Sequence, residues 1–416
     1  MTISDRPLKG IRVLDFTHAA AGPYATMMLA DLGAEVIKIE KPGRGDGARH
    51  MGKPMLGPVE SDYYVALNRN KRGVALDLRT EEGRAVALEL AEKSDIVIQN
   101  FRPGVMERLG LGYEQIRERR PGIIYSSISA FGTTGPLSSR PANDIIMQAV
   151  SGLMGITGEV GGGPVRVGAP LSDYGTGLFS LIGILTALYA RDQHPEGQHI
   201  EVAMLDSSIA LMANYIPGVA GLGETIPRSG RTHAQIVPYQ AFECSDGAYV
   251  MVGAFTNGFW KRLCIALDRP EWPADERFLT NADRLRHRNI IVPMIEEIFR
   301  GRAREEWLDI LNEADVPASP VLELHEAIVS EQAQANQVIQ DVGTPEQPVP
   351  TVRFPVRSTS WPLAESNTPP RIGQDSQEVL SRVLGKNTEE IAALLASGAV
   401  ASSDGIPAMA ASGAKP

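Results

Sequence analysis

The chain has 416 residues, 43% of them apolar and 22% charged, which is enough apolar material for more than one hydrophobic core. Its formal net charge of −10 excludes a general nucleic-acid binder, because such proteins need a net basic face. Any anionic ligand must therefore meet Lys and Arg side chains that gather locally. Cys244 and Cys264 are too few for a disulfide framework or a zinc site, so we expect two buried free thiols.

The sequence favours a cytoplasmic protein that binds neither nucleic acid nor membrane. Its first ten residues lack the apolar core of a signal peptide. The longest apolar run, residues 177–190, is too short to span a bilayer and is typical of a buried helix.

The first third of the chain alternates β-rich runs with helical patterns. These patterns predict helices over residues 24–32 and, after an N-cap at Thr80, as far as Lys93. The predicted strands cover residues 11–16, 35–40, 74–78, 96–99 and 123–127. Helices between strands indicate an α/β fold with a mostly parallel sheet covered on both faces. Ligands of such sheets bind beside the carboxyl ends of the strands.

The remaining sequence predicts helices around the glycine-rich segment 158–170, followed by a smaller α+β domain with strands near residues 239–244 and 249–253. We therefore expect four regions: a large domain over 1–215, a small domain over 225–325, a return segment over 330–397 that completes the large domain, and a flexible tail over 398–416.

Several common catalytic signatures are absent from the sequence. It contains no GxxxxGKS/T phosphate loop, no GxSxG nucleophile elbow and no HExxH zinc pair. The seven histidines show no metal-ligand spacing. The glycines at 43, 45 and 47 also miss the dinucleotide-binding fingerprint. The sequence therefore gives no support to a Rossmann dehydrogenase or a metallohydrolase.

Asp173 is the first candidate catalytic residue. It lies in GAPLSDYGTG, directly before an apolar helix expected to start near Thr176. An aspartate at that place is commonly an N-cap. Gly175 and Gly177 could also expose backbone N–H groups to a developing oxyanion, and a carboxylate held there can act as a nucleophile on a thioester.

Basic and polar residues follow several predicted strands. Lys41 follows the second strand, Arg79 follows the third, and the triplet 100–102 (Asn-Phe-Arg) follows the fourth, with Arg108 a little further on. Cations at one sheet edge suit a phosphorylated ligand, although a single exposed Lys or Arg is commonly solvated surface charge.

Eight segments in a fixed order resemble the class III coenzyme A transferases, of the formyl-CoA transferase and carnitine CoA-transferase type. They are VLDFTHAAAGP (13–23), LGAEVIKIEKPGRGD (32–46), LNRNKRGVALDL (67–78), DIVIQNFRPGVMERLGLGY (95–113), YSSISAFGTTGP (125–136), DIIMQAVSGLMGITG (144–158), GAPLSDYGTGLFSLIGILTALYAR (168–191) and GQHIEVAMLDS (197–207). The similarity is specific over residues 8 to 210 and looser as far as residue 385.

The resemblance implies a Rossmann-like large domain, a small domain, and a homodimer of two interlocked chains. It implies that Asp173 is the catalytic aspartate and that CoA is a substrate, with no metal and no nucleoside triphosphate. The positions implied to contact CoA are Ala20, Ala21, Lys41, Leu76, Asp77, Leu78, Arg79, Asn100, Phe101, Arg102, Arg108, and the stretch from Arg140 to Asn143.

The implied reaction moves CoA from an acyl-CoA donor to a small carboxylic acid through an aspartyl anhydride and an aspartyl-CoA thioester. Ala20 stands where formyl-CoA transferases have glutamine, so the sequence is more similar to relatives that act on small dicarboxylates, with succinyl-CoA as a donor. The cationic side chains that could meet the far carboxylate are Arg166, Arg228, Arg231 and His233.

Two alternatives remain open from sequence. Acyl-CoA racemases of the same superfamily have a histidine where this chain has Asn143, and an amide cannot exchange a proton at neutral pH. A non-catalytic CoA-binding protein is the other alternative, because similarity of fold does not ensure activity.

Overall fold

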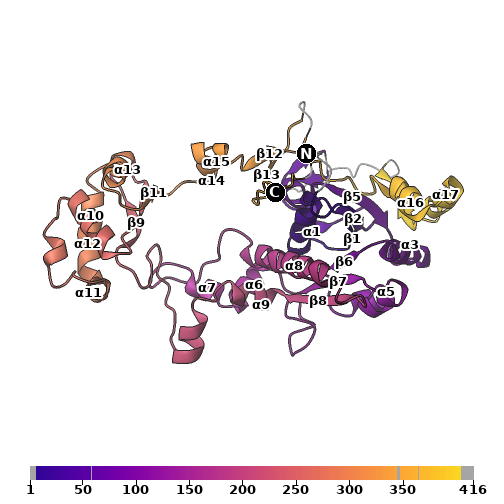
Figure 1. Cartoon of the computed structure of the whole chain (residues 1–416), viewed down its shortest axis with the longest axis horizontal. Helices are drawn as coiled ribbons and strands as arrows, with labels where there is room; N and C mark the ends of the chain where they lie inside the picture. Colours follow the sequence, from indigo (N-terminus) through magenta and orange to yellow (C-terminus); the bar gives the residue numbers. More distant parts are fainter. Residues whose placement is uncertain (1–5, 58, 344–346, 364, 404–416) are drawn as a thin grey trace, which may run out of the picture. The chain divides into compact units, whose positions relative to one another are not determined.

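The structure is a computed structural model that describes residues 6–57, 59–343, 347–363 and 365–403 (Figure 1). The chain forms two compact units. The first contains Met1–Leu153, Val167–Gly221 and Asn336–Pro416, and the second contains Met154–Arg166 and Leu222–Ala335. The short segment Met154–Arg166 thus belongs to the second unit, whereas the predicted large domain ran without interruption to residue 215.

The first unit is built on a seven-stranded sheet of order β14-β5-β2-β1-β6-β7-β8. All neighbouring strands are parallel except β14, which pairs antiparallel with β5. The strands are β1 (Arg12–Asp15), β2 (Glu35–Glu40), β5 (Lys71–Leu76), β6 (Ile96–Gln99), β7 (Ile124–Ser129), β8 (Gln198–Ala203) and β14 (Val400–Ala401). Chain order reverses between β1 and β6, and a doubly wound sheet holds its ligand at that reversal. This confirms the predicted α/β fold with a Rossmann-like sheet.

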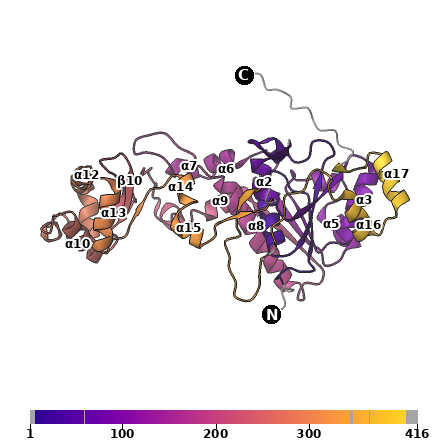
Figure 2. The same ribbon diagram turned by 90° about the horizontal axis from the view of Figure 1, so that it is seen from above.

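Helices cover both faces of this sheet (Figures 1 and 2). One face packs on α1 (Ala21–Asp31) and α8 (Leu171–Ala190), and the other on α3 (Glu81–Glu92), α5 (Tyr113–Arg119), α16 (Ser376–Leu384) and α17 (Thr388–Ala396). Further α-helices and strands of this unit are α2 (Asp62–Asn68), α4 (Val105–Arg108), α6 (Asp144–Val150), α9 (Met204–Ala210), β3 (Pro54–Leu56), β4 (Glu60–Ser61), β12 (Ile339–Asp341) and β13 (Pro350–Val352). Helix α7 (Leu153–Ile156) spans the boundary to the second unit. Because α16 and α17 close one core, the C-terminal segment completes the first unit.

Local sequence explains where several of these elements begin. Thr80 caps α3 as predicted, since its side chain accepts the backbone N–H of Gly83. The central strands are buried along their whole length, which accounts for their nearly continuous apolar sequence. β5 begins at Lys71, earlier than the predicted residue 74, and its Lys71 side chain is buried beside Asp15. Because β5 begins with charged residues, the pattern of apolar residues in the sequence did not reveal the start of this strand.

The second unit has its own core around a three-stranded antiparallel sheet of order β11-β10-β9. The strands are β9 (Tyr239–Glu243), β10 (Tyr249–Gly253) and β11 (Ala318–Pro320). The helices are α10 (Asn257–Ala266), α11 (Asn281–Arg286), α12 (Arg288–Phe299), α13 (Arg304–Glu313), α14 (Leu324–Ala327) and α15 (Glu331–Ala335). Cys244 and Cys264 are free and buried, as predicted. This unit confirms the expected smaller α+β region.

Two predictions about the chain's ends and its apolar helix are wrong. The tail beyond residue 398 was expected to be flexible, yet Val400 and Ala401 pair with β5 as strand β14; residues 404–416 lie outside the described residues. Helix α8 has 20 residues, more than the predicted apolar run. Among the described residues it is the one helix long and apolar enough to cross a membrane, a weak indication because a core helix passes the same test. α8 packs against α1 and the sheet.

Candidate active site

A pocket of about 330 Å³ opens at the carboxyl ends of β1, β6 and β7, where the strand order reverses. Parallel strands present their following loops at one edge, so residues distant in sequence converge there. This first pocket brings together eight of the predicted site residues: Ala20, Ala21, Asn100, Phe101, Arg102, Arg140, Asn143 and Asp173.

A second pocket of about 320 Å³ lies beyond β2 and β5. His18 and Phe101 line both pockets, so the two form neighbouring compartments of one crevice. The second compartment holds five of the other six predicted residues: Lys41, Leu76, Asp77, Leu78 and Arg79. Arg108 lines neither compartment, although its neighbour Leu109 lines the second. Each volume lies in the range typical of small-molecule sites, roughly 300–1,000 Å³.

Asp173 lies inside helix α8, in its first turn, and this corrects the predicted position before the helix. The residue before α8 is Pro170, which provides no side-chain cap. The Asp173 carboxylate forms no hydrogen bond or ion pair with any residue in the described part of the chain. Asp173 is therefore not the capping residue that a helix start suggests, and its carboxylate is free at the wall of the first pocket.

The glycines after Asp173 do not form the expected oxyanion site. Both lie within α8 and are buried. A Cβ at Gly177 would lie 2.6 Å from the carbonyl oxygen of Ala21, and one at Gly175 would lie 2.6 Å from Leu211. The two glycines therefore permit close packing of α8 against α1 and the segment after α9, which explains their place in the sequence.

Asp144 neighbours Asp173 and changes its electrostatics. Asp144 Oδ1 accepts the backbone N–H groups of Ser172 at 2.9 Å and Asp173 at 3.2 Å, and so caps α8 from another helix. Burial, and secondly the Asp144 charge, raise the pKa of Asp173 to about 7. A carboxyl with a raised pKa, in a pocket and without a partner, is typical of a functional group.

Several cations at the crevice have no counter-ion. Lys41, Arg102 and Arg140 line the crevice and form no ion pair within the residues that the structure describes. Arg79 differs, because its Nη2 lies 2.5 Å from Asp77 Oδ2. The hydrogen bond from Arg79 lowers the pKa of Asp77 to about 2. In an acidic protein, unpaired cations around one crevice indicate an anionic ligand.

Sequence reasoning missed two residues of this site. His18 lines both compartments, and Asp144 sets the environment of Asp173. His18 stands two residues before the predicted contact Ala20, and Asp144 directly follows Asn143, so adjacency to predicted contacts was the available signal. Asn143 caps α6, with Oδ1 accepting the backbone N–H of Ile146 at 3.2 Å.

The four side chains predicted to meet a distal carboxylate all belong to the second unit. Arg228 donates hydrogen bonds to the carbonyl oxygens of Gly162 and Gly155, and Arg231 pairs with Glu296 at 3.5 Å. The His233 ring stacks on Tyr239, 5.2 Å between ring centroids. Arg166 also belongs to this unit. Arg228, Arg231 and His233 thus have structural contacts within their own unit.

Comparison with known proteins agrees with the fold and the crevice. The family model for CoA-transferase family III matches residues 8–376. The chain is 37% identical over 404 residues to the succinyl-CoA:glutarate CoA-transferase of Homo sapiens, which covers 95% of this chain and 90% of that protein. It is 39% identical over 347 residues to the acetyl-CoA:oxalate CoA-transferase of Acetobacter aceti, covering 82% and 88%.

A solved structure of a CAIB/BAIF family protein from Brucella suis is similar with a TM-score of 0.83 and 33% identity, covering 91% of this chain and all of that one. The fold, the crevice and these matches define a transferase that acts on CoA thioesters. The chain belongs to CoA-transferase family III and is a CoA-transferase.

Proposed function

We propose that this enzyme moves CoA from an acyl-CoA donor to a small dicarboxylic acid, with Asp173 as the covalent acyl carrier. The observation that carries the proposal is the Asp173 carboxylate, which is unpaired among the described residues and lines a pocket whose rim holds Arg102 and Arg140. An ionised carboxylate without competing partners is a nucleophile, and nearby cations favour an anionic thioester substrate.

The first half of the reaction transfers the donor acyl group. An Asp173 oxygen attacks the thioester carbonyl, the C–S bond breaks, and CoA leaves as a thiolate, which gives a mixed anhydride. The thiolate then attacks the aspartyl carbonyl, the C–O bond to the donor acid breaks, and an aspartyl-CoA thioester remains. The second half repeats these steps in reverse with the acceptor carboxylate and restores the Asp173 carboxylate. One thioester replaces another, so no external energy source is needed.

The protein's remaining contribution is binding and exclusion of water. The second compartment places Lys41 and Arg79 beside apolar Leu76 and Leu78, which suits the phosphorylated nucleotide of CoA. The first compartment holds Asp173 and suits the thioester end of the same molecule. Burial of Asp173 protects the anhydride from hydrolysis.

The acid substrate is proposed from the named relatives, which include enzymes for glutarate, mesaconate and oxalate. We expect succinyl-CoA to serve as donor and a small dicarboxylate such as glutarate or mesaconate as acceptor. The test is to incubate the enzyme with succinyl-CoA and a panel of mono- and dicarboxylic acids, and to measure new acyl-CoA species by mass spectrometry. Exchange confined to monocarboxylic acids would contradict the dicarboxylate assignment, and tight CoA binding without any exchange would favour a non-catalytic protein.

We infer that two chains form a homodimer, because one face of the first unit exposes many apolar side chains. On α8, Ile182 is 56% exposed and Tyr189 88% exposed, and on the adjoining α6, Ile145 is 50% exposed. A monomeric protein seldom exposes so much apolar surface on packed neighbouring helices. Sedimentation equilibrium is expected to give twice the 44.9 kDa mass of one chain.

The variant Ile182→Glu should shift this dimer towards monomer, because the charge would be buried at the interface. The control Ile265→Glu changes an isoleucine that is 66% exposed outside this face, and it should leave the mass unchanged. A monomeric wild-type enzyme at micromolar concentration contradicts the inference.

We also expect a cytoplasmic location, in keeping with the buried free thiols Cys244 and Cys264.

A further inference from the structure

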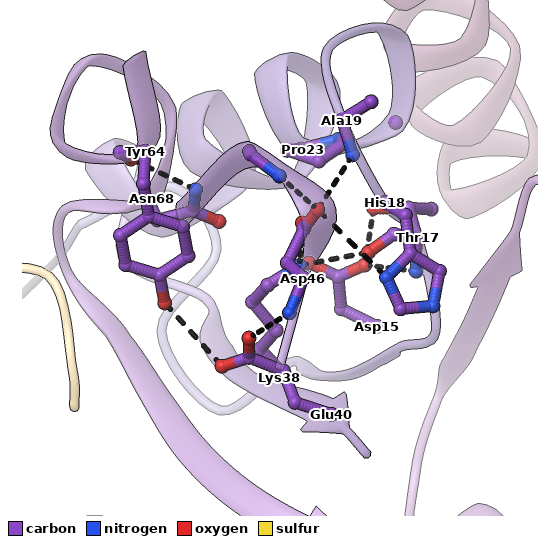
Figure 3. Close-up of polar contacts among 12 residues, drawn as sticks. Asp15, Thr17, His18, Ala19, Pro23, Lys38, Glu40, Asp46, Tyr64 and Asn68 are labelled. Atoms are coloured by element: carbon purple, nitrogen blue, oxygen red, sulfur yellow. Dashed lines mark hydrogen bonds and ion pairs between the residues drawn. The ribbon is translucent and has the colours of Figure 1, made fainter. Parts of the chain in front are cut away.

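Buried charged side chains hold the loop that joins β1 to α1 (Figure 3). Asp15 Oδ1 accepts the backbone N–H of Thr17 at 2.8 Å and its hydroxyl at 2.5 Å. Lys38 Nζ donates to the carbonyl oxygen of Thr17 at 2.7 Å. Asp46 Oδ1 accepts the backbone N–H of Ala19 at 3.0 Å. Each of the three charged residues fixes a backbone group of the loop, although they come from separate segments of the chain.

The Ala19 backbone adopts a conformation that needs such support. Its φ is 63°, in the left-handed region that costs a non-glycine residue about 1–2 kcal/mol. Asp46 Oδ1 also accepts the N–H of Ala48 at 3.0 Å, and Asp46 Oδ2 lies 3.0 Å from Lys38 Nζ, with both side chains fully buried. Glu40 Oε1 in turn accepts the N–H of Asp46 at 2.7 Å. Contacts with Glu40 and Lys38 therefore fix Asp46, and Asp46 in turn fixes the backbone N–H of Ala19.

The residue that this loop places is His18, at the junction of the two compartments. Its backbone N–H and carbonyl oxygen both bond to the side-chain amide of Asn100, each at 2.8 Å. Its ring meets the Phe101 ring edge to face, with 5.2 Å between centroids. The His18 side chain keeps 33% of its surface exposed, and its Nδ1 lies 3.9 Å from Asp46 Oδ1. The ring makes no hydrogen bond to any described residue, so its Nε2 is free for a ligand.

We propose that Asp46, through the backbone of Ala19, is a positioning residue that fixes the His18 ring at this junction, where the ring contacts the chain joining the nucleotide of CoA to its thiol. The inference rests on the proposed function, because it assumes that CoA occupies both compartments. A molecule that reaches from Lys41 in one compartment to Asp173 in the other must pass His18 and Phe101, which line both.

Two double variants separate positioning from charge burial. Lys38→Met with Asp46→Asn removes both charges and keeps an acceptor for the Ala19 N–H. Lys38→Met with Asp46→Leu removes the charges and the acceptor together. A buried ion pair adds little net stability over apolar residues of similar size, so both variants are expected to fold. Circular dichroism and urea unfolding check this before binding is measured.

Isothermal titration with free CoA is the main measurement. Both double variants lose the hydrogen bond from Lys38 to the Thr17 carbonyl oxygen, so the difference between them reports the Asp46 acceptor alone. The double variant that carries Asp46→Leu should bind CoA at least about tenfold more weakly than the one that carries Asp46→Asn, because small displacements of a positioning group have large effects. Asp31→Asn is the control: Asp31 forms a buried pair with Arg69 at the other end of α1, about 15 Å along the helix from the pocket. It should lower stability and leave CoA affinity unchanged.

The variant His18→Ala tests the same proposal without disturbing the buried charges. It should weaken the binding of CoA, yet leave unchanged the binding of adenosine 3′,5′-bisphosphate, which lacks the chain that leads to the thiol. Equal CoA affinity in the two double variants, or normal CoA affinity in His18→Ala, overturns the inference. If the wild-type enzyme binds no CoA at all, the proposed function itself fails, and that result is distinct from the other two.

Discussion

The variant Asp173→Asn is expected to retain its fold and to lose acyl exchange, with kcat reduced by roughly 10³-fold or more. The amide has nearly the same shape as the carboxylate, and no described residue depends on a hydrogen bond to the Asp173 side chain. Asparagine cannot form the anhydride, so the covalent path is closed. The measurement is the rate of CoA exchange between succinyl-CoA and the best acceptor acid from the panel.

Stability supplies an independent check on this variant, and it should change in the opposite direction to activity. Burial raises the pKa of Asp173 to about 7, so the folded wild type is penalised once that carboxyl ionises. The part of the folding free energy that depends on a neutral Asp173 carboxyl is present at low pH and is lost as the pH rises through 7. At pH 8 the amide variant should therefore be more stable than the wild type, by about 2 kcal/mol after allowance for the partial exposure of the group.

The matched control for this experiment is Asp206→Asn. Asp206 also lies in the first turn of a helix of the first unit, α9, but it is exposed and does not line the pocket. Its amide variant should exchange CoA at the wild-type rate.

A second measurement looks for the covalent intermediate. When the wild-type enzyme is quenched during turnover, Asp173 should carry an adduct, detected by mass spectrometry of peptides. Normal turnover by Asp173→Asn, with no such adduct in the wild type, would show that another group carries the reaction.

The second large effect is expected in the pH dependence of kcat/KM for the acyl-CoA. The nucleophile must be ionised, so the rate should fall by about tenfold per pH unit below about pH 7, as Asp173 takes up a proton. An ordinary exposed carboxyl would produce this loss only near pH 4. The profile of kcat/KM reports the free enzyme, which is the state that the structure describes.

Asp144→Asn should move this midpoint towards lower pH, by about half a unit or more, because it removes a neighbouring like charge. Asparagine Oδ1 can still accept the N–H groups of Ser172 and Asp173, so the start of α8 is preserved. The midpoint should stay above that of an ordinary carboxyl, since burial is the larger cause and remains. An unchanged midpoint in Asp144→Asn, or a wild-type midpoint near pH 4, contradicts this account of Asp173.

Local sequence determined the parts of this protein that depend on short-range patterns. The strands at 35–40 and 96–99 and the cap at Thr80 follow from β-rich runs and capping chemistry. The start of α8 was misplaced, because its N-terminus is capped by Asp144 from another helix instead of by a local side chain. A cap supplied from 28 residues away leaves no local signal at the helix start.

The sequence by itself determined the family, the doubly wound order of elements, and the identity of Asp173 as the candidate nucleophile. Only the tertiary structure decided that Asp173 lies within α8 beside Asp144, and that His18 joins the two compartments. The reason is physical: a pattern of side chains specifies helices and strands one at a time. The burial and charge that set a pKa, or a loop conformation such as that of Ala19, arise only when distant segments pack together.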